Sequence, residues 1–172
     1  MTPPEEIQNT SAFTIRSYLP EDHPGVINVI KSVMDEYNYI MDFGEFDSDL
    51  VDIQSTYQDP GGEFWVLEID HTIAGTVAAM PRQGETCELK RLYLLKGHRG
   101  RGWGRRLMET MLGWARLHGF RRVVLWSDVL FEPAHNLYLK AGFRPTQETR
   151  SIDPNNPSCV ERFFVRKKNR GE

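Results

Sequence analysis

A glycine- and arginine-rich stretch, RGRGWGRR (residues 99–106), stands between a strand-like segment and a helix-like one. The segment before it is CELKRLYLL (87–95), and LMETMLGWARLHGF follows with helical spacing and ends at Gly119. Glycines let the backbone bring successive N–H groups close to a bound group. The helix after them begins with unsatisfied N–H donors and a partial positive charge. The sequence therefore predicts an anion site between strand and helix, with phosphate as the usual guest.

The spacing of the glycines distinguishes this stretch from other phosphate loops. The chain contains no Gly-Lys-Ser or Gly-Lys-Thr, which excludes the nucleoside-triphosphate loop. Gly100, Gly102 and Gly104 give G-x-G-x-G, which does not match the dinucleotide fingerprint G-x-G-x-x-G. The stretch matches R-x-x-G-x-G instead, with Arg99, Gly102 and Gly104 at the fixed positions.

The remaining pattern predicts one α+β domain over residues 13–168, after a flexible tail at 1–12. Apolar alternation and turn signals predict strands at 13–18, 63–70, 71–80, 87–95, 121–129 and 159–167. Helical spacing predicts a helix from about 20 to 37, a short one at 47–57 capped by Asp47 or Ser48, and others over 101–118 and 133–142. A hairpin is expected at Asp70-His71. We expect a mixed, mostly antiparallel sheet of six to seven strands flanked by four helices.

The strand before the glycine-rich turn changes phase. Leu89 has an odd number and Leu92 and Leu94 have even ones, so a regular strand would place Leu89 on the opposite face. Either helices cover both faces, or a β-bulge near Lys90-Arg91 brings the three leucines to one face. A bulge would also leave backbone groups unpaired, and an extended amide ligand could bond to them.

These features together resemble the GNAT superfamily of N-acetyltransferases, over nearly the whole predicted domain. R-x-x-G-x-G resembles its coenzyme A pyrophosphate loop, ELKRLYL its fourth strand, and AHNLYLKAGF its A-x-x-L-Y-x-x-x-G-F signature. The resemblance implies that acetyl-CoA is the cosubstrate, with its pantetheine on the backbone of Leu92 and Leu94 and its pyrophosphate on N–H groups from Arg99 to Arg105. The cofactor-binding residues it implies are Leu92, Tyr93, Leu94, Arg99, Gly100, Arg101, Gly102, Trp103, Gly104 and Arg105. The sequence departs from the family at Phe131, where an Asn often bonds pantetheine, and at Lys96, where a proline is common.

Acetyl transfer to an amine constrains the catalytic residues. A free alkylamine has a pKa of about 10.4 and must lose a proton before it attacks, and the leaving thiolate is helped by an acid. By the resemblance, Tyr138 is the acid, with packing on an amphipathic helix as the alternative. Glu88 is the first choice of base, unless it is a surface carboxylate paired with Lys90 or an arginine. Asp128 is the other base or the group that binds the amine.

Other residues receive weaker roles. His135 shares a helix face with Tyr138 and is expected to pack. Cys87 could suggest a nucleophile, but no histidine is near it in sequence and the family transfers acetyl directly. No cluster has metal-ligand spacing, so no metal is expected.

The charges are divided along the chain. Residues 32–81 hold eleven Asp and Glu and no Lys or Arg, whereas 82–122 hold eleven Lys and Arg and three acids. Solvated faces explain most such runs. The sharper hypothesis is that the basic part attracts the coenzyme, while Asp42, Glu45, Asp47, Asp49 and Asp52 attract a cationic amine.

The partners expected are therefore acetyl-CoA and an amine-bearing small molecule or peptide. Nucleic acid is not expected, because the chain is net acidic, with a formal charge of −3. No apolar run is long enough for a membrane span, and two cysteines without a secretory signal indicate free thiols in the cytoplasm. The resemblance also allows a homodimer through the last strands. A non-catalytic acyl-CoA-binding module is the alternative to an enzyme.

Overall fold

Seven strands form one sheet in the computed structural model, which describes residues 12–153 and 158–168. Their order across the sheet is β1-β2-β3-β4-β5-β7-β6, and all neighbours are antiparallel except β4 and β5. The strands are β1 Phe13–Ser17, β2 Glu63–Ile69, β3 Thr72–Pro81, β4 Thr86–Leu94, β5 Arg122–Asp128, β6 Arg144–Ser151 and β7 Val160–Lys167. This confirms the predicted mixed, mostly antiparallel sheet. Of the expected N-terminal tail, residues 1–11 lie outside the described residues.

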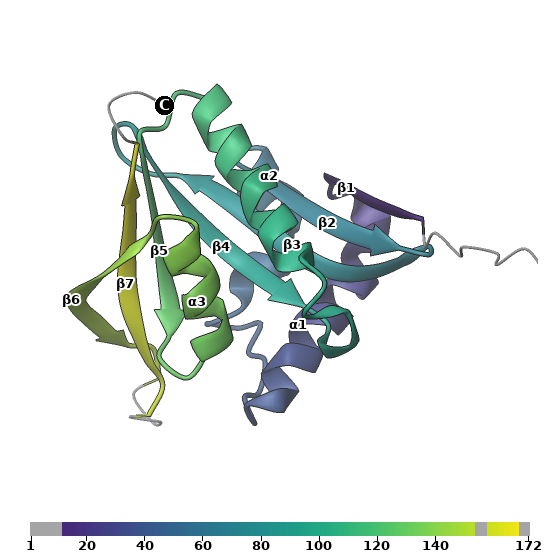
Figure 1. Ribbon diagram of the computed structural model, residues 1–172. Helices are drawn as coiled ribbons and strands as arrows, with labels where there is room; N and C mark the ends of the chain where they lie inside the picture. Colours follow the sequence, from purple (N-terminus) through teal and green to yellow (C-terminus); the bar gives the residue numbers. More distant parts are fainter. Residues whose placement is uncertain (1–11, 154–157, 169–172) are drawn as a thin grey trace, which may run out of the picture.

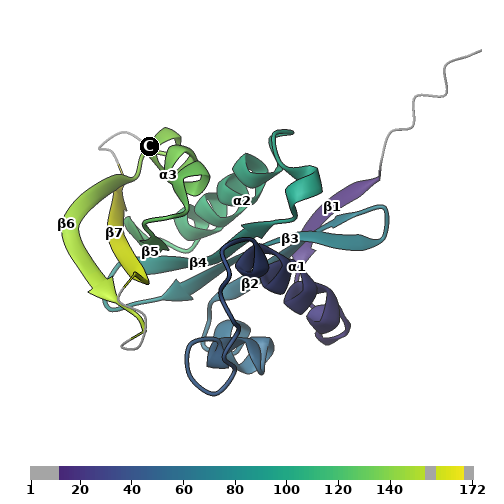
Figure 2. The same ribbon diagram turned by 90° about the horizontal axis from the view of Figure 1, so that it is seen from below.

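Helices cover both faces of the sheet. On one face lies α1 (His23–Glu36), and on the other lie α2 (Trp103–Leu117) and α3 (Glu132–Lys140), as the two views in Figures 1 and 2 show. Short helical turns occur at Pro20–Asp22 (η1), Ser48–Leu50 (η2), Gln54–Gln58 (η3) and Lys96–His98 (η4). Within the described residues, no helix combines the length and apolar character that crossing a membrane requires.

The central strands are buried on both sides, which gives two hydrophobic cores. On β2, Trp65 and Leu67 enter the core beneath α2, and Phe64 and Val66 enter the core beneath α1. Since successive strand residues point to opposite faces, the apolar run of β2 supplies both cores at once.

The turn between β2 and β3 confirms the predicted hairpin. Asp70 and His71 both have positive φ angles, 48° and 62°. Two such residues in a two-residue loop match the right-handed twist of the paired strands.

Two elements differ from the predictions. The expected short helix at 47–57 is divided into the 3₁₀ turn η2 and the π-helical turn η3, although its apolar residues Leu50 and Tyr57 are buried as expected. Asp47 is the N-cap residue of η2 as predicted, but its side chain makes no capping hydrogen bond, because its carboxylate is bound to Arg91. The edge strand β6 was not located from the sequence, because RPTQETRS is exposed and polar along most of its length.

Candidate active site

A β-bulge interrupts β4 where the phase change predicted it. Thr76 of β3 pairs with Tyr93, but Ala78, two residues on, pairs with Lys90, so β4 contains one extra residue. Arg91 lies inside the bulge, with a φ angle of 54°. Both observations confirm the bulge near Lys90-Arg91.

The bulge brings the three leucines of β4 to one face. Leu89 is buried in the core beneath α2, and Leu92 and Leu94 pack against that same core. The interposed Tyr93 packs on the opposite side, against the core beneath α1. The bulge alternative is therefore confirmed, even though helices also cover both faces of the sheet.

After a short paired region, β4 and β5 separate. They pair in parallel only from Thr86 to Glu88 on β4 and from Arg122 to Val124 on β5. Beyond Glu88 the two strands diverge, as Figure 1 shows. The edge of β4 that faces β5 therefore presents backbone groups to a cleft, where an extended amide ligand can bond to them.

The glycine-rich turn closes one end of this cleft. Gly100 and Gly102 have φ angles of 77° and 84°, which side chains disfavour. Gly102 is the N-cap of α2, and within the described part of the chain no side chain caps the N–H groups that follow it. A Cβ on either glycine would meet no neighbouring atom within 4 Å. The turn thus combines an open surface with helix N–H donors, which fits an anion.

A cavity of about 720 Å³, the glycine-loop pocket, lies between this turn, β4 and α3. Its lining includes nine of the ten predicted cofactor-binding residues: Leu92, Tyr93, Leu94, Arg99, Gly100, Gly102, Trp103, Gly104 and Arg105. The tenth, Arg101, does not line it and is exposed.

Two of the four arginines of the turn form ion pairs, whereas Arg101 is exposed and does not line the pocket, and Arg106 stacks over the rings of Phe13 and Trp103. Arg99 forms two hydrogen bonds, of 2.7 and 2.8 Å, with the carboxylate of Glu36 at the end of α1, and Arg105 pairs with Glu109. Backbone N–H groups are therefore the main donors that the turn can direct at an anion. The ring of Trp103 packs edge-on against that of Phe13 of β1, with the two centroids 4.5 Å apart.

A second cavity, the acidic pocket, has a volume of about 680 Å³ and opens between the end of α1, β4 and β5. Six carboxylate residues and three basic residues line it: Asp42, Asp47, Glu88, Asp128, Asp153 and Glu161, with Lys90, Arg91 and Arg150. Tyr93 and Phe131 line both cavities. The two pockets therefore meet at these aromatic side chains.

The structure places Glu88 and Asp128 in the acidic pocket but gives them different partners. Glu88 accepts two hydrogen bonds from the guanidinium of Arg82, one of them 2.7 Å long from Nε. The alternative in which Glu88 pairs with an arginine is thus the observed one. Asp128 is 4% exposed, and no cationic side chain pairs with it among the described residues.

Neutral donors hold the Asp128 carboxylate instead. The phenol of Tyr39 donates to Oδ2 at 2.7 Å, and the backbone N–H of Leu130 donates to Oδ1 at 2.8 Å. Burial, together with this carboxylate, raises the pKa of Tyr39, so the phenol keeps its proton. His135 bonds the Asp128 carbonyl oxygen through Nε2 at 2.9 Å, and its ring packs on Phe164 with centroids 5.1 Å apart.

Tyr138 lies in the hydrophobic core beneath α2 and α3. Its ring contacts Phe143 and Phe164 edge-on, it is 5% exposed, and it lines neither pocket. Its helix neighbours Leu137 and Ala141 do line the glycine-loop pocket. Burial raises the pKa of Tyr138, so the phenol is protonated at neutral pH.

The acidic residues expected to attract an amine are used differently. Asp47 and Asp49 form ion pairs with Arg91. The Asp52 carboxylate accepts the N–H of Ser55 and does not line the pocket. Of the five acids, only Asp42 and Asp47 line the acidic pocket, so the charge run by itself does not define the site.

Sequence reasoning missed two aromatic residues of the site. Tyr39 was not singled out, because nothing in the local sequence links it to Asp128, 89 residues away. Phe131 was noted only as a departure from the family, but its ring packs on Tyr37 with centroids 4.5 Å apart. Phe131 thus stands where the family often has an Asn, and it makes an apolar contact between the end of α1 and the start of α3.

Among the described residues, no three His, Cys, Asp or Glu side chains are grouped as metal ligands, and the absence of a metal stays a prediction. Cys87 is fully buried, lines neither pocket and has its pKa raised to about 12 by burial. A buried thiol of this kind is a poor nucleophile.

Comparisons with known proteins agree with this geometry. The sequence profile of the Acetyltransferase (GNAT) family matches residues 29–143. The uncharacterized N-acetyltransferase YjgM of Escherichia coli is 31% identical over 128 residues, which cover 72% of this chain and 77% of YjgM. The rat N-acetyltransferase 8F1 is 36% identical over 104 residues, 58% of this chain, and the chain spans 47% of its length.

Solved structures show the same fold. An acetyltransferase of the GNAT family from Staphylococcus aureus superposes with a TM-score of 0.81 at 24% identity, covering 92% of this chain and 100% of that one. YncA of Salmonella typhimurium, a putative acetyltransferase solved with its cofactor acetyl-CoA, gives a TM-score of 0.73 at 18% identity, covering 92% and 95%.

Proposed function

The chain belongs to the acetyltransferase (GNAT) family of N-acetyltransferases, and from this premise we propose that it transfers an acetyl group from acetyl-CoA directly to a primary amine of a small molecule or peptide. One observation carries the proposal: the glycine-loop pocket and the acidic pocket meet at Tyr93 and Phe131. A thioester entering from one side and an amine entering from the other would meet at this junction. Both substrates are bound together, without an acyl-enzyme.

The glycine-loop pocket suits the anionic end of acetyl-CoA. The uncapped N–H groups at the start of α2 would bond the pyrophosphate, and Gly100 and Gly102 leave room for its approach. The free edge of β4 at Leu92 and Leu94 would bond the amide groups of the pantetheine. Cofactor binding thus depends mainly on backbone groups, which act in the conformations that the bulge and the glycines impose.

The acidic pocket suits a cationic amine, and Asp128 is its best-placed ligand. A buried carboxylate that no cation neutralises gains most from an ammonium group. Asp128 would bind the ammonium form and accept a proton from it, directly or through water, so that the nitrogen can attack. Glu88 is the weaker choice of base, because Arg82 already shares its charge.

Tyr138 is proposed as the acid that protonates the leaving thiolate. The support is its position in the family signature and a phenol that burial keeps protonated. In the balanced step, the neutral amine nitrogen bonds the carbonyl carbon, the carbon–sulfur bond breaks, the sulfur takes the phenol proton, and the nitrogen releases its surplus proton to solvent as the amide forms. Solvent restores the phenol proton afterwards.

An amine panel tests the function. The protein is incubated with acetyl-CoA and amino acids, polyamines, aminoglycosides and short peptides, and products are identified by a mass increase of one acetyl group. We expect amine-dependent release of coenzyme A for at least one class, which Asp128→Asn abolishes. Tight acetyl-CoA binding without acetyl transfer to any amine would instead support the non-catalytic module.

A further inference from the structure

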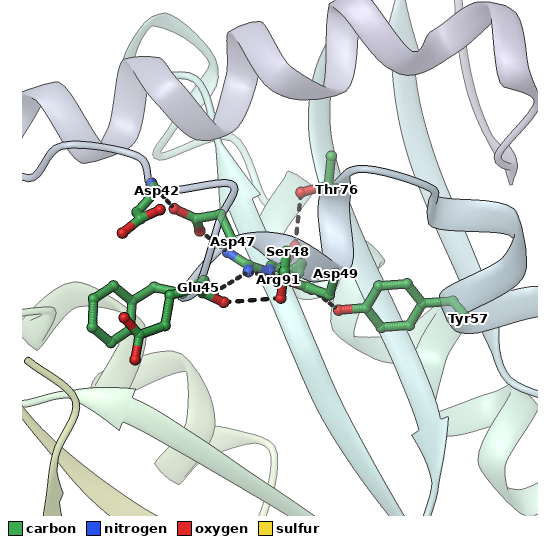
Figure 3. A network of polar contacts seen from close by, with 9 residues as sticks. Asp42, Glu45, Asp47, Ser48, Asp49, Tyr57, Thr76 and Arg91 are labelled. Carbon is green, nitrogen blue, oxygen red and sulfur yellow. Dashed lines mark hydrogen bonds and ion pairs between the residues drawn. The ribbon is translucent and has the colours of Figure 1, made fainter.

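One buried arginine connects the bulge of β4 to the loop that precedes β2. Arg91 donates from Nη1 to Asp47 and from Nε to Asp49, both at 2.9 Å, and a further bond joins Nη2 to Asp49 (Figure 3). Its side chain is 10% exposed. Both carboxylates belong to residues 42–50, which we call the acceptor loop. Charge-assisted bonds in such a fixed fork hold the loop in one position relative to β4.

The same residue sets the backbone of the bulge. Arg91 has a φ of 54°, a left-handed conformation that residues with a side chain rarely adopt. The hydroxyl of Thr76, which is fully buried, donates to the Arg91 carbonyl oxygen at 2.7 Å. The bulge is therefore held by the Arg91 side chain on one side and by its carbonyl on the other.

The two ends of this network face different pockets. Leu92, Tyr93 and Leu94, directly after Arg91, line the glycine-loop pocket. The acceptor loop contributes Asp42, Phe46 and Asp47 to the acidic pocket, and none of residues 42–50 lines the glycine-loop pocket. Arg91 itself lines the acidic pocket, so its side chain joins the acceptor loop to the segment of β4 that continues into the glycine-loop pocket.

We infer that Arg91 is a positioning residue that couples the two substrate sites, so that acetyl-CoA bound along β4 orders the acceptor loop and raises the affinity for the amine. The inference rests on the proposed function in that acetyl-CoA occupies the glycine-loop pocket. Bonds from the pantetheine to the backbone after Arg91 would favour the bulged conformation, and the guanidinium would transmit this to Asp47 and Asp49. Linkage requires the reverse effect, in which a bound amine raises the affinity for acetyl-CoA by the same factor.

Hydrogen exchange tests the coupling without knowledge of the amine. In the wild-type chain, saturating acetyl-CoA should slow amide exchange in residues 42–50 by about fivefold or more. Asp47→Asn removes one charge from the link, leaves Asp49 in place, and should bind acetyl-CoA with a dissociation constant within about threefold of wild type. Its acceptor loop should nevertheless lose most of the response to acetyl-CoA. Thr76→Val removes the hydroxyl that bonds the Arg91 carbonyl oxygen in the bulge, and it should also weaken the response of the acceptor loop to acetyl-CoA.

Two further variants separate positioning from folding. Arg91→Lys keeps the charge but not the fork, so it should restore part of the response that Arg91→Gln loses. Arg16 is the matched control, because it also joins two carboxylates, Asp22 and Glu68, at 2.7 and 2.8 Å, but lines neither pocket. Arg16→Lys should leave the response unchanged.

The outcomes are distinguishable. An acceptor loop that responds to acetyl-CoA equally in wild type and Asp47→Asn, or in neither, overturns the coupling and leaves the proposed function intact. Failure of the wild-type chain to bind acetyl-CoA overturns both proposals.

Discussion

The phenol of Tyr39 donates a 2.7 Å hydrogen bond to Asp128, joining the segment after α1 to the end of β5 across the acidic pocket. Since the Leu130 N–H occupies the other carboxylate oxygen, Asp128 is fixed in orientation yet not neutralised by a cation among the described residues. A fixed, anionic and buried carboxylate is what an amine-binding base requires. Among the carboxylates of the acidic pocket, Asp128 is therefore the one whose substitution should lower acetyl transfer to the amine most.

We expect Asp128→Asn to lower kcat/KM for the amine by about 100-fold or more, because the amide neither attracts the ammonium nor accepts its proton. Tyr39→Phe should lower it by about tenfold, since it loosens the carboxylate but keeps its charge. Steady-state kinetics with the acceptor from the amine panel measures both. The acetyl-CoA dissociation constant is the control and should change little in either variant. Equal activity of Asp128→Asn and wild type would exclude Asp128 from amine binding and proton transfer.

Glu88→Gln should reduce kcat by no more than about fivefold, because Arg82 already holds this carboxylate in an ion pair. Arg82→Gln is the informative partner, since it frees the Glu88 carboxylate while leaving it in the pocket. If Glu88 were the base, Glu88→Gln would instead lower kcat by at least about 100-fold. The pH dependence of kcat/KM, measured for Glu88→Gln and for Arg82→Gln, separates a Glu88 that acts as the base from one that does not.

Tyr138→Phe should lower kcat by at least about tenfold with little change in the KM of either substrate, if the phenol protonates the thiolate. Burial raises the pKa of this phenol above its ordinary value of about 10, so the wild-type kcat should not decline between pH 8 and 10 through its ionisation. Thermal unfolding of Tyr138→Phe serves as the control, because the ring contacts with Phe143 and Phe164 are retained. An unchanged kcat would leave Tyr138 with the packing role that its burial already explains.

Cys87→Ala should retain full acetyl transfer, with a stability cost of about 1 kcal/mol from the lost buried sulfur. Direct attack needs no thiol, and a thiol whose pKa is raised to about 12 carries almost no thiolate at neutral pH. Intact-mass measurement after mixing with acetyl-CoA alone checks for an acyl-enzyme. An acetylated protein that loses the label when amine is added would contradict direct transfer.

The features that could be predicted from the sequence are those specified by local pattern. The phase change between Leu89 and Leu92 located the bulge, and the glycine spacing located the turn before α2. Asp70-His71 likewise identified its hairpin from two residues. Each of these depends on backbone preferences of a few neighbouring residues, which the sequence states directly.

The rest depends on contacts between distant segments. The charge run containing Asp47 and Asp49 suggested an attractive surface, but Arg91, more than forty residues away, neutralises both. Glu88 was the first choice of base on the sequence, but the structure places Arg82 beside it and pairs the two. Strand β6 has little apolar pattern, because it is an exposed edge strand held by its pairing with β7. The pattern of one sequence cannot choose among such pairings, because they depend on tertiary contacts between distant segments.

Gly102 at the start of α2 and Gly113 in its C-terminal half give a matched test of cofactor binding. Gly102 has a φ of 84°, so Gly102→Ala places a side chain in a left-handed conformation at a cost of about 1–2 kcal/mol and turns the following N–H groups away from the pyrophosphate. We expect its KM for acetyl-CoA to rise by about tenfold or more, with kcat at saturation largely kept. Gly113 lies within the same helix, and a Cβ there would meet nothing within 4 Å, so Gly113→Ala should leave this KM unchanged and raise stability by about 0.5–1 kcal/mol. Steady-state kinetics measures kcat and this KM, isothermal titration with acetyl-CoA analogues such as coenzyme A measures affinity, and thermal unfolding measures stability. Equal acetyl-CoA affinity in the two variants would show that the backbone at Gly102 does not hold the pyrophosphate, and the arginine side chains would then have to supply that contact.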